Sequence, residues 1–142
     1  MQAVMGRILA IDYGKKRTGL AVSDPLKIIA GGLCTLPSQN VISFLNKYCL
    51  KEEVELFLLG EPKQMNYKPS ENMERVLKFK NVLQQAFPQI EIKLADERFT
   101  SVLAHKAVIE GGLKKKDRQN KALIDELSAT ILLQTYLETS RL

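Results

Sequence analysis

Residues 7–36 read RILAIDYGKKRTGLAVSDPLKIIAGGLCTL, and this stretch decides the fold. Apolar runs over 7–13, 18–23 and about 28–36 predict strands, which are separated by GKKR and by DPLK. Connections this short join antiparallel neighbours. The chain is therefore expected to begin with a three-stranded antiparallel meander.

Helices and strands alternate along the rest of the chain. After Ser38, a candidate N-cap, apolar residues recur at helical spacing as far as residue 49. The nearly continuous apolar run at 54–59 predicts a strand covered on both faces.

A second helix is expected from the candidate N-cap Ser70 to Pro88, and the alternation at 90–94 predicts the last strand. Two further helices are expected at about 100–112 and 120–137. The order β-β-β-α-β-α-β-α-α predicts an α/β fold, a mixed five-stranded sheet with helices on both faces. Crossovers between its parallel strands should be right-handed.

Length and composition indicate one globular domain over residues 1–142, with 45% hydrophobic residues to fill its core. The longest apolar runs, such as 8–11, are far shorter than the ~20 residues of a membrane span. The first residues lack the apolar stretch of a signal peptide. We therefore expect a cytoplasmic protein with no membrane partner.

The net charge of +5 is concentrated in two basic clusters. The first comprises Lys15, Lys16 and Arg17, and the second comprises Lys114, Lys115, Lys116, Arg118 and Lys121. Segregated positive charge favours a polyanionic partner such as nucleic acid. A solvated basic loop is the alternative explanation for each cluster.

Cysteine and histidine chemistry is not expected. The two cysteines, Cys34 and Cys49, lack CxxC spacing, and the single histidine, His105, has no recognisable nucleophile beside it. Acid–base chemistry would therefore come from carboxylates or from a metal ion.

Three acids occupy informative positions. Asp12 ends an apolar strand, and Glu97 follows the last strand beside Arg98. Asp125 lies in the inward stripe of the final helix, so it needs a partner, which is either an Arg or Lys or a cation. The structural alternatives are a turn-capping aspartate, a surface salt bridge to Arg98 and a buried ion pair.

The three acids can form one cluster. If the first and last strands are parallel neighbours, Asp12 and Glu97 share an edge of the sheet, and the final helix can bring Asp125 to it. Carboxylates this close repel unless a divalent cation neutralises them, and Mg²⁺ prefers such oxygen ligands. The chemistry implied is metal-assisted phosphoryl transfer.

Residues 10–24 (AIDYGKKRTGLAVSD), residues 96–100 (DERFT) and Asp125 with 129–137 resemble the motifs of the YqgF/RuvX family. The resemblance implies a ribonuclease H-like fold, with Asp12, Glu97 and Asp125 as catalytic residues that bind Mg²⁺ or Mn²⁺. Its members are described as Holliday-junction resolvases and as nucleases that mature the 5′ end of small-subunit ribosomal RNA. The residues expected to bind nucleic acid are Lys15, Lys16, Arg17, Arg98, Lys114, Lys115, Lys116, Arg118 and Lys121.

The main interpretation is a metal-dependent nuclease acting in the 5′-end maturation of pre-16S ribosomal RNA. The alternatives are a Holliday-junction resolvase acting on DNA and a non-catalytic nucleic-acid-binding module. An ATP-binding lobe is disfavoured, because that architecture closes two lobes around the nucleotide and the chain has room for one. Structured RNA is the favoured substrate, a DNA junction stays open, and so does a homodimer.

Overall fold

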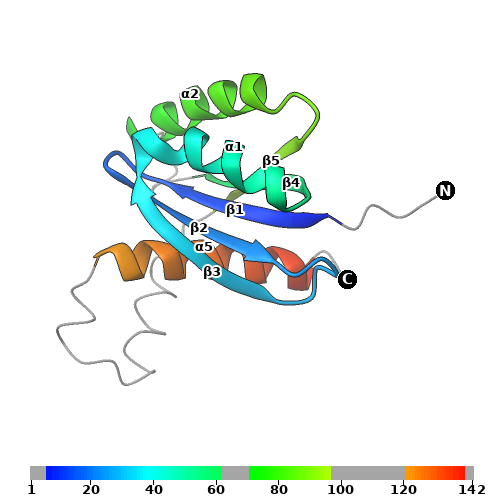
Figure 1. Ribbon diagram of the computed structural model, residues 1–142. Coiled ribbons are helices and arrows are strands. Elements are labelled where there is room, and N and C mark those ends of the chain that lie inside the picture. The colour runs from blue at the N-terminus through cyan, green and yellow to red at the C-terminus, as the bar shows by residue number, and fades with distance from the viewer. Residues whose placement is uncertain (1–5, 62–70, 97–120, 140–142) are drawn as a thin grey trace.

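The computed structural model describes residues 6–61, 71–96 and 121–139. Its strands form a mixed five-stranded sheet (Figure 1): β1 (Arg7–Tyr13), β2 (Arg17–Ser23), β3 (Ala30–Pro37), β4 (Val54–Glu61) and β5 (Glu91–Asp96). Its helices are α1 (Val41–Lys51), which follows the 3-10 turn η1 (Ser38–Asn40), α2 (Glu71–Ala86) and α5 (Lys121–Thr139). The expected α/β order is confirmed over these ranges. The helix expected at about 100–112 and the Ser70 cap lie outside the described residues.

The sheet order is β3-β2-β1-β4-β5. The first three strands pair antiparallel, as predicted, while β1 pairs with β4 and β4 with β5 in parallel. The condition considered for the acid cluster, that the first and last strands are direct neighbours, is not met, because β4 lies between them. This strand is buried along almost its whole length, as its apolar sequence requires. β1 and β5 still end at the same edge of the sheet, since both run parallel to β4.

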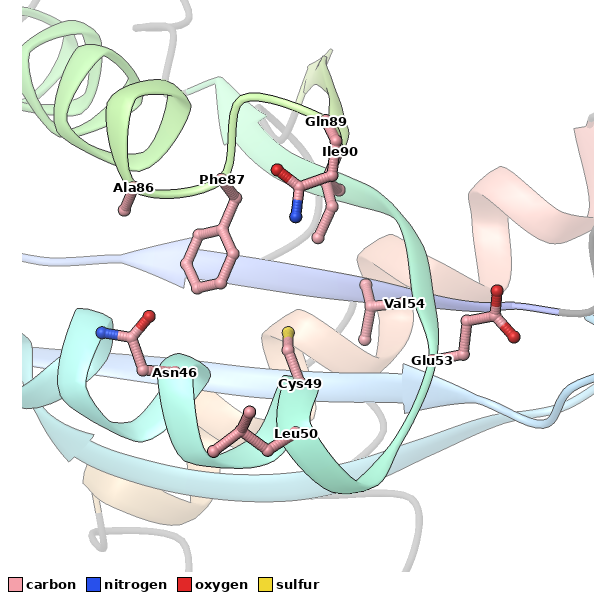
Figure 2. Close-up of a pocket in the computed structure, with 9 residues that line it drawn as sticks. All are labelled: Asn46, Cys49, Leu50, Glu53, Val54, Ala86, Phe87, Gln89 and Ile90. Carbon is pink, nitrogen blue, oxygen red and sulfur yellow. The ribbon is translucent and has the colours of Figure 1, made fainter.

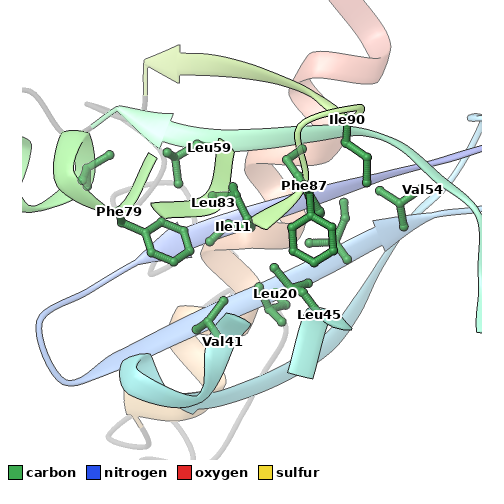
Figure 3. Close-up of a cluster of buried hydrophobic side chains, with 13 residues drawn as sticks. Ile11, Leu20, Val41, Leu45, Val54, Leu59, Phe79, Leu83, Phe87 and Ile90 are labelled. Atoms are coloured by element: carbon green, nitrogen blue, oxygen red, sulfur yellow. The ribbon is translucent and has the colours of Figure 1, made fainter. Parts of the chain in front are cut away.

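One face of the sheet is covered by α1 and α2 (Figure 1). Leu9 and Ile11 of β1 project to this side, where the larger of the two hydrophobic clusters forms. Figure 3 shows its side chains, including Phe79 and Leu83 of α2 and Val41 of α1. This core anchors both crossover helices and so fixes the direction of β4 and β5.

The other face is covered by α5 (Figure 1). Ile8 and Ala10 alternate with the residues of the first core and contact the buried side of α5, which is formed by Ala129, Leu132, Leu133 and Leu137. Small residues on the sheet, such as Ala10 and Ala21, let the helix approach closely. Helices on both faces are therefore confirmed. None of the helices in the described ranges is long and apolar enough to cross a membrane.

The third strand begins later than expected, at Ala30, because the carboxylate of Asp24 organises the preceding loop. It accepts hydrogen bonds from the backbone N–H groups of Leu26 (3.1 Å), Ile28 (2.7 Å) and Ile29 (2.8 Å). These bonds, first of all that from Ile29, favour the ionised form and lower the pKa of Asp24 below its ordinary value. The loop therefore depends on an ionised Asp24.

Candidate active site

Helix α5 crosses strand β2 directly above Gly19. A Cβ atom on this residue would lie 2.5 Å from the carbonyl carbon of Asp125 and 2.9 Å from the backbone nitrogen of Glu126. Glycine inside a strand often marks such a close approach of another backbone. The absence of a side chain at Gly19 therefore sets how near Asp125 comes to the sheet.

Asp12 lies on the same face as this contact. It is the direct partner of Gly19 in the β1–β2 ladder, and residues paired in this way project to the same side of the sheet. Ile8 and Ala10, which share the alternation of Asp12, pack in the cluster under α5. The structure therefore brings the predicted acids Asp12 and Asp125 to neighbouring positions around Gly19.

The carboxylate of Asp125 has a cationic partner, Arg17. The guanidinium Nε lies 3.0 Å from Oδ2, and the two side chains are 39% and 29% exposed. Arg17 precedes Gly19 by two residues and so projects to the same face. The sequence left an Arg, a Lys or a cation open as the partner of Asp125, and the structure supplies an arginine from the first basic cluster.

The turn that carries this cluster is held by a buried hydroxyl network. The Ser38 hydroxyl donates to the Gly14 carbonyl (2.6 Å) and shares a hydrogen bond with the Thr18 hydroxyl (2.8 Å). The Ser38 backbone N–H donates to the Lys16 carbonyl (3.0 Å). The expected N-cap role of Ser38 was wrong, because its hydroxyl is used in this turn. Lys15 and Lys16 remain exposed on a turn of fixed shape.

Other predicted site residues lie outside the described part of the chain. Glu97 is the residue after β5, the strand that ends at the same edge as β1. Within the described ranges no group of three His, Cys, Asp or Glu side chains could hold a metal. Those ranges contain only two of the three expected ligands. Lys121 is the first residue of α5, and the other cations predicted to bind nucleic acid that lie outside the described residues are Arg98, Lys114, Lys115, Lys116 and Arg118.

Gly19 and Ser38 are the site residues that sequence analysis missed. A glycine in an otherwise apolar strand was the available signal for Gly19, since it marks a close backbone approach. No sequence signal was available for Ser38, because a serine that precedes a helix usually caps that helix.

A pocket lies at the opposite edge of the sheet, where β4 and β5 begin (Figure 2). It has a volume of about 430 Å³, and its lining includes Val54, Phe87 and Ile90. Its ionisable groups are Glu53 and the thiol of Cys49, whose pKa is raised by burial. A protonated thiol and one carboxylate do not resemble a phosphoryl-transfer centre. The carboxylates around Gly19 are therefore the better candidate site.

The sheet order, with Asp12 at the end of β1, defines an α/β protein of the ribonuclease H-like class. A solved structure of the same fold supports this: "T. thermophilus RuvC in complex with Holliday junction substrate" aligns with a TM-score of 0.57 at 16% identity, over 96% of each chain. At this identity the likeness establishes the fold alone. The fold class predicted from the sequence is confirmed.

The chain belongs to the RuvX family, described as "Holliday junction resolvase", which matches residues 6–139. A relative from Phocaeicola vulgatus is 60% identical over 96% of this chain and 99% of its own. A relative from Bacteroides thetaiotaomicron is 58% identical over the same shares. Both carry the name "Putative pre-16S rRNA nuclease". The predicted family is confirmed, and with it the enzyme class: a nuclease, a hydrolase of phosphodiester bonds.

Proposed function

We propose that this chain is a metal-dependent nuclease that cleaves precursor 16S ribosomal RNA during maturation of its 5′ end. The observation that carries the proposal is the convergence of Asp12 and Asp125 around Gly19. Two carboxylates from distant parts of the chain share one face at the end of a strand, beside exposed cations. This arrangement suits phosphoryl transfer, whose transition state needs charge neutralisation and positioning.

Asp12 and Asp125 have the donor chemistry that a divalent cation requires. Both are carboxylates, and the Asp125 side chain is partly exposed, so an ion from solvent can reach it. Glu97 is the proposed third ligand. A bound Mg²⁺ or Mn²⁺ would supply Lewis-acid polarisation of the phosphate and activation of the attacking water.

The basic turn would hold the substrate next to these acids. Lys15 and Lys16 are exposed, and the hydroxyl network of Ser38 fixes the backbone that carries them. Cations on a preorganised turn bind phosphates with a smaller entropy cost than cations on a flexible segment. The second basic cluster would bind further phosphates of the same substrate.

The choice of RNA rests on the relatives. The relatives from Phocaeicola vulgatus and Bacteroides thetaiotaomicron are named for pre-16S rRNA, and their identity to this chain extends over almost its whole length. A four-way DNA junction is the second candidate substrate, favoured by the family's description and by the RuvC complex, which has the same fold. Both substrates offer the same phosphodiester chemistry.

Cleavage assays separate these possibilities. A precursor rRNA fragment, a single strand and a four-way DNA junction are incubated with wild type and with Asp12→Asn, Glu97→Gln and Asp125→Asn. We expect Mg²⁺- or Mn²⁺-dependent cleavage of the rRNA precursor, and its near abolition in each variant because each loses one ligand charge at constant volume. A variant that cleaves at the wild-type rate removes that residue from the site. Binding without cleavage by every protein would support the non-catalytic module instead.

A further inference from the structure

We propose that Arg17 neutralises Asp125 until a divalent cation replaces the guanidinium at this carboxylate. In this view the guanidinium and the cation compete for the same carboxylate, and the displaced guanidinium becomes available to a substrate phosphate. The proposal rests on the proposed function, since it assumes that Asp12 and Asp125 hold the cation.

The geometry around Gly19 carries the first step. Arg17 Nε lies 3.0 Å from Asp125 Oδ2, on the face of the sheet that also carries Asp12. A carboxylate oxygen in a charge-assisted hydrogen bond has less lone-pair density to offer a metal ion. The guanidinium and a cation held by the same carboxylate also repel each other, so binding of the cation at Asp125 favours withdrawal of the guanidinium from Oδ2.

The side chain can withdraw while its backbone stays in place. Arg17 is the first residue of β2 and pairs with Pro37 of β3. Its carbonyl oxygen lies so close to Gly14 that a Cβ atom added to Gly14 would be 2.5 Å from this oxygen. The guanidinium end is different, since the Arg17 side chain is 39% exposed and its partner 29%. Ion pairs that solvent reaches are weak and exchange partners readily.

A withdrawn guanidinium remains beside the acids. Arginine presents planar donors that match the oxygens of a phosphate, so the nearest phosphate of a nucleic acid is its natural new partner. Each event then promotes the other: a cation at Asp125 releases Arg17 for phosphate, and a phosphate on Arg17 clears Asp125 for the cation. Thermodynamic linkage makes this coupling reciprocal.

Mn²⁺ binding to the protein without nucleic acid tests the competition. Free Mn²⁺ is measured by electron paramagnetic resonance in titrations of wild type, Arg17→Gln, Lys16→Gln and Asp125→Asn. The Lys16 variant is the matched control, because it removes one positive charge from the same turn at an exposed position. We expect Arg17→Gln to bind Mn²⁺ about two- to fivefold more tightly than wild type, which corresponds to the upper part of the energy range of a partly exposed ion pair. The Lys16→Gln change should be less than about twofold, because its charge is screened.

A second measurement follows the Arg17 side chain of the wild-type protein by nuclear magnetic resonance. The Nε–H resonance of Arg17, identified by its loss in Arg17→Lys, should shift and exchange faster when Mg²⁺ is added to the wild-type protein. An unchanged resonance at saturating Mg²⁺ would overturn the proposal.

The two proposals fail in different ways. If Arg17→Gln binds Mn²⁺ no more tightly than Lys16→Gln, while Asp125→Asn loses binding, the metal site stands and the role of Arg17 is wrong. If wild type and Asp125→Asn bind Mn²⁺ equally, the proposed metal site itself is wrong.

Discussion

Gly19→Ala should disable the site although it replaces none of the proposed ligand residues. The new Cβ would lie 2.5 Å from the carbonyl carbon of Asp125 and closer still to its carbonyl oxygen, where ordinary contacts begin at 3.4 Å, so the start of α5 must move by about 1 Å or more. The helix resists this movement because Ala129 and Leu133 are completely buried against the sheet. Overpacking of this kind costs about 1–3 kcal/mol. For a domain of this size that corresponds to a fall in melting temperature of about 3–10 °C.

The effect on cleavage should exceed the effect on stability. A misplacement of about 1 Å at a catalytic group can cost about a hundredfold in rate. The assay is single-turnover cleavage at a temperature where calorimetry shows both proteins folded. Gly31→Ala is the control, since its Cβ would meet nothing closer than the Val22 carbonyl oxygen at 3.9 Å. Wild-type rate and melting temperature in Gly19→Ala would refute the idea that this contact positions Asp125.

Three further predictions concern the metal, the basic cluster and the Asp24 loop. Mg²⁺ or Mn²⁺ should stabilise the wild-type protein by about 2.7 kcal/mol at a concentration of a hundred times the dissociation constant, and should stabilise Asp125→Asn less. Thermal melting of both proteins with and without the ion tests this, and melting temperatures that do not change with divalent ions in either protein would contradict the metal site. Replacing the four cations of 114–118 with Gln should make the affinity for nucleic acid less dependent on salt. The slope of log affinity against log salt should fall by about 0.9 for each lost phosphate contact to a duplex, or by about 0.7 for each lost contact to a single strand. Identical slopes in both proteins would mean that the cluster is only solvated. Because the pKa of Asp24 is lowered in the folded state, its stabilising contribution is complete above the ordinary value of 3.8 and is lost as the pH falls through the lower folded pKa. Asp24→Asn should therefore flatten the dependence of unfolding free energy on pH in this acid range, and an unchanged acid profile would contradict the assignment.

Local patterns predicted most of the fold. The short connections at 14–17 and 24–27 indicated an antiparallel meander, and the structure contains it. The order of the parallel strands was harder, since any strand after a crossover can pair on either side of its predecessor. Burial of β4 on both faces was the available signal for its central place, because a strand covered on both sides belongs inside a sheet.

The sequence identified the acidic residues of the candidate site, but it did not identify the residues that contact them. An inward carboxylate on the last helix required a counter-charge, and both a guanidinium and a metal ion satisfy that requirement. Only the three-dimensional arrangement selects Arg17, because its proximity to Asp125 depends on where α5 crosses β2. Ser38 was misassigned for a similar reason, since its hydroxyl bonds to residues of an adjacent turn and not to its own helix.

The most direct test of the central claim is single-turnover cleavage of a precursor 16S rRNA fragment by wild type and Asp12→Asn, with Mg²⁺ and with a chelator. We expect 5′-end cleavage by wild type in Mg²⁺, none with the chelator, and near-complete loss in an Asp12→Asn protein that keeps the wild-type circular dichroism spectrum. Equal cleavage by the two proteins, or cleavage that persists with the chelator, would contradict this claim.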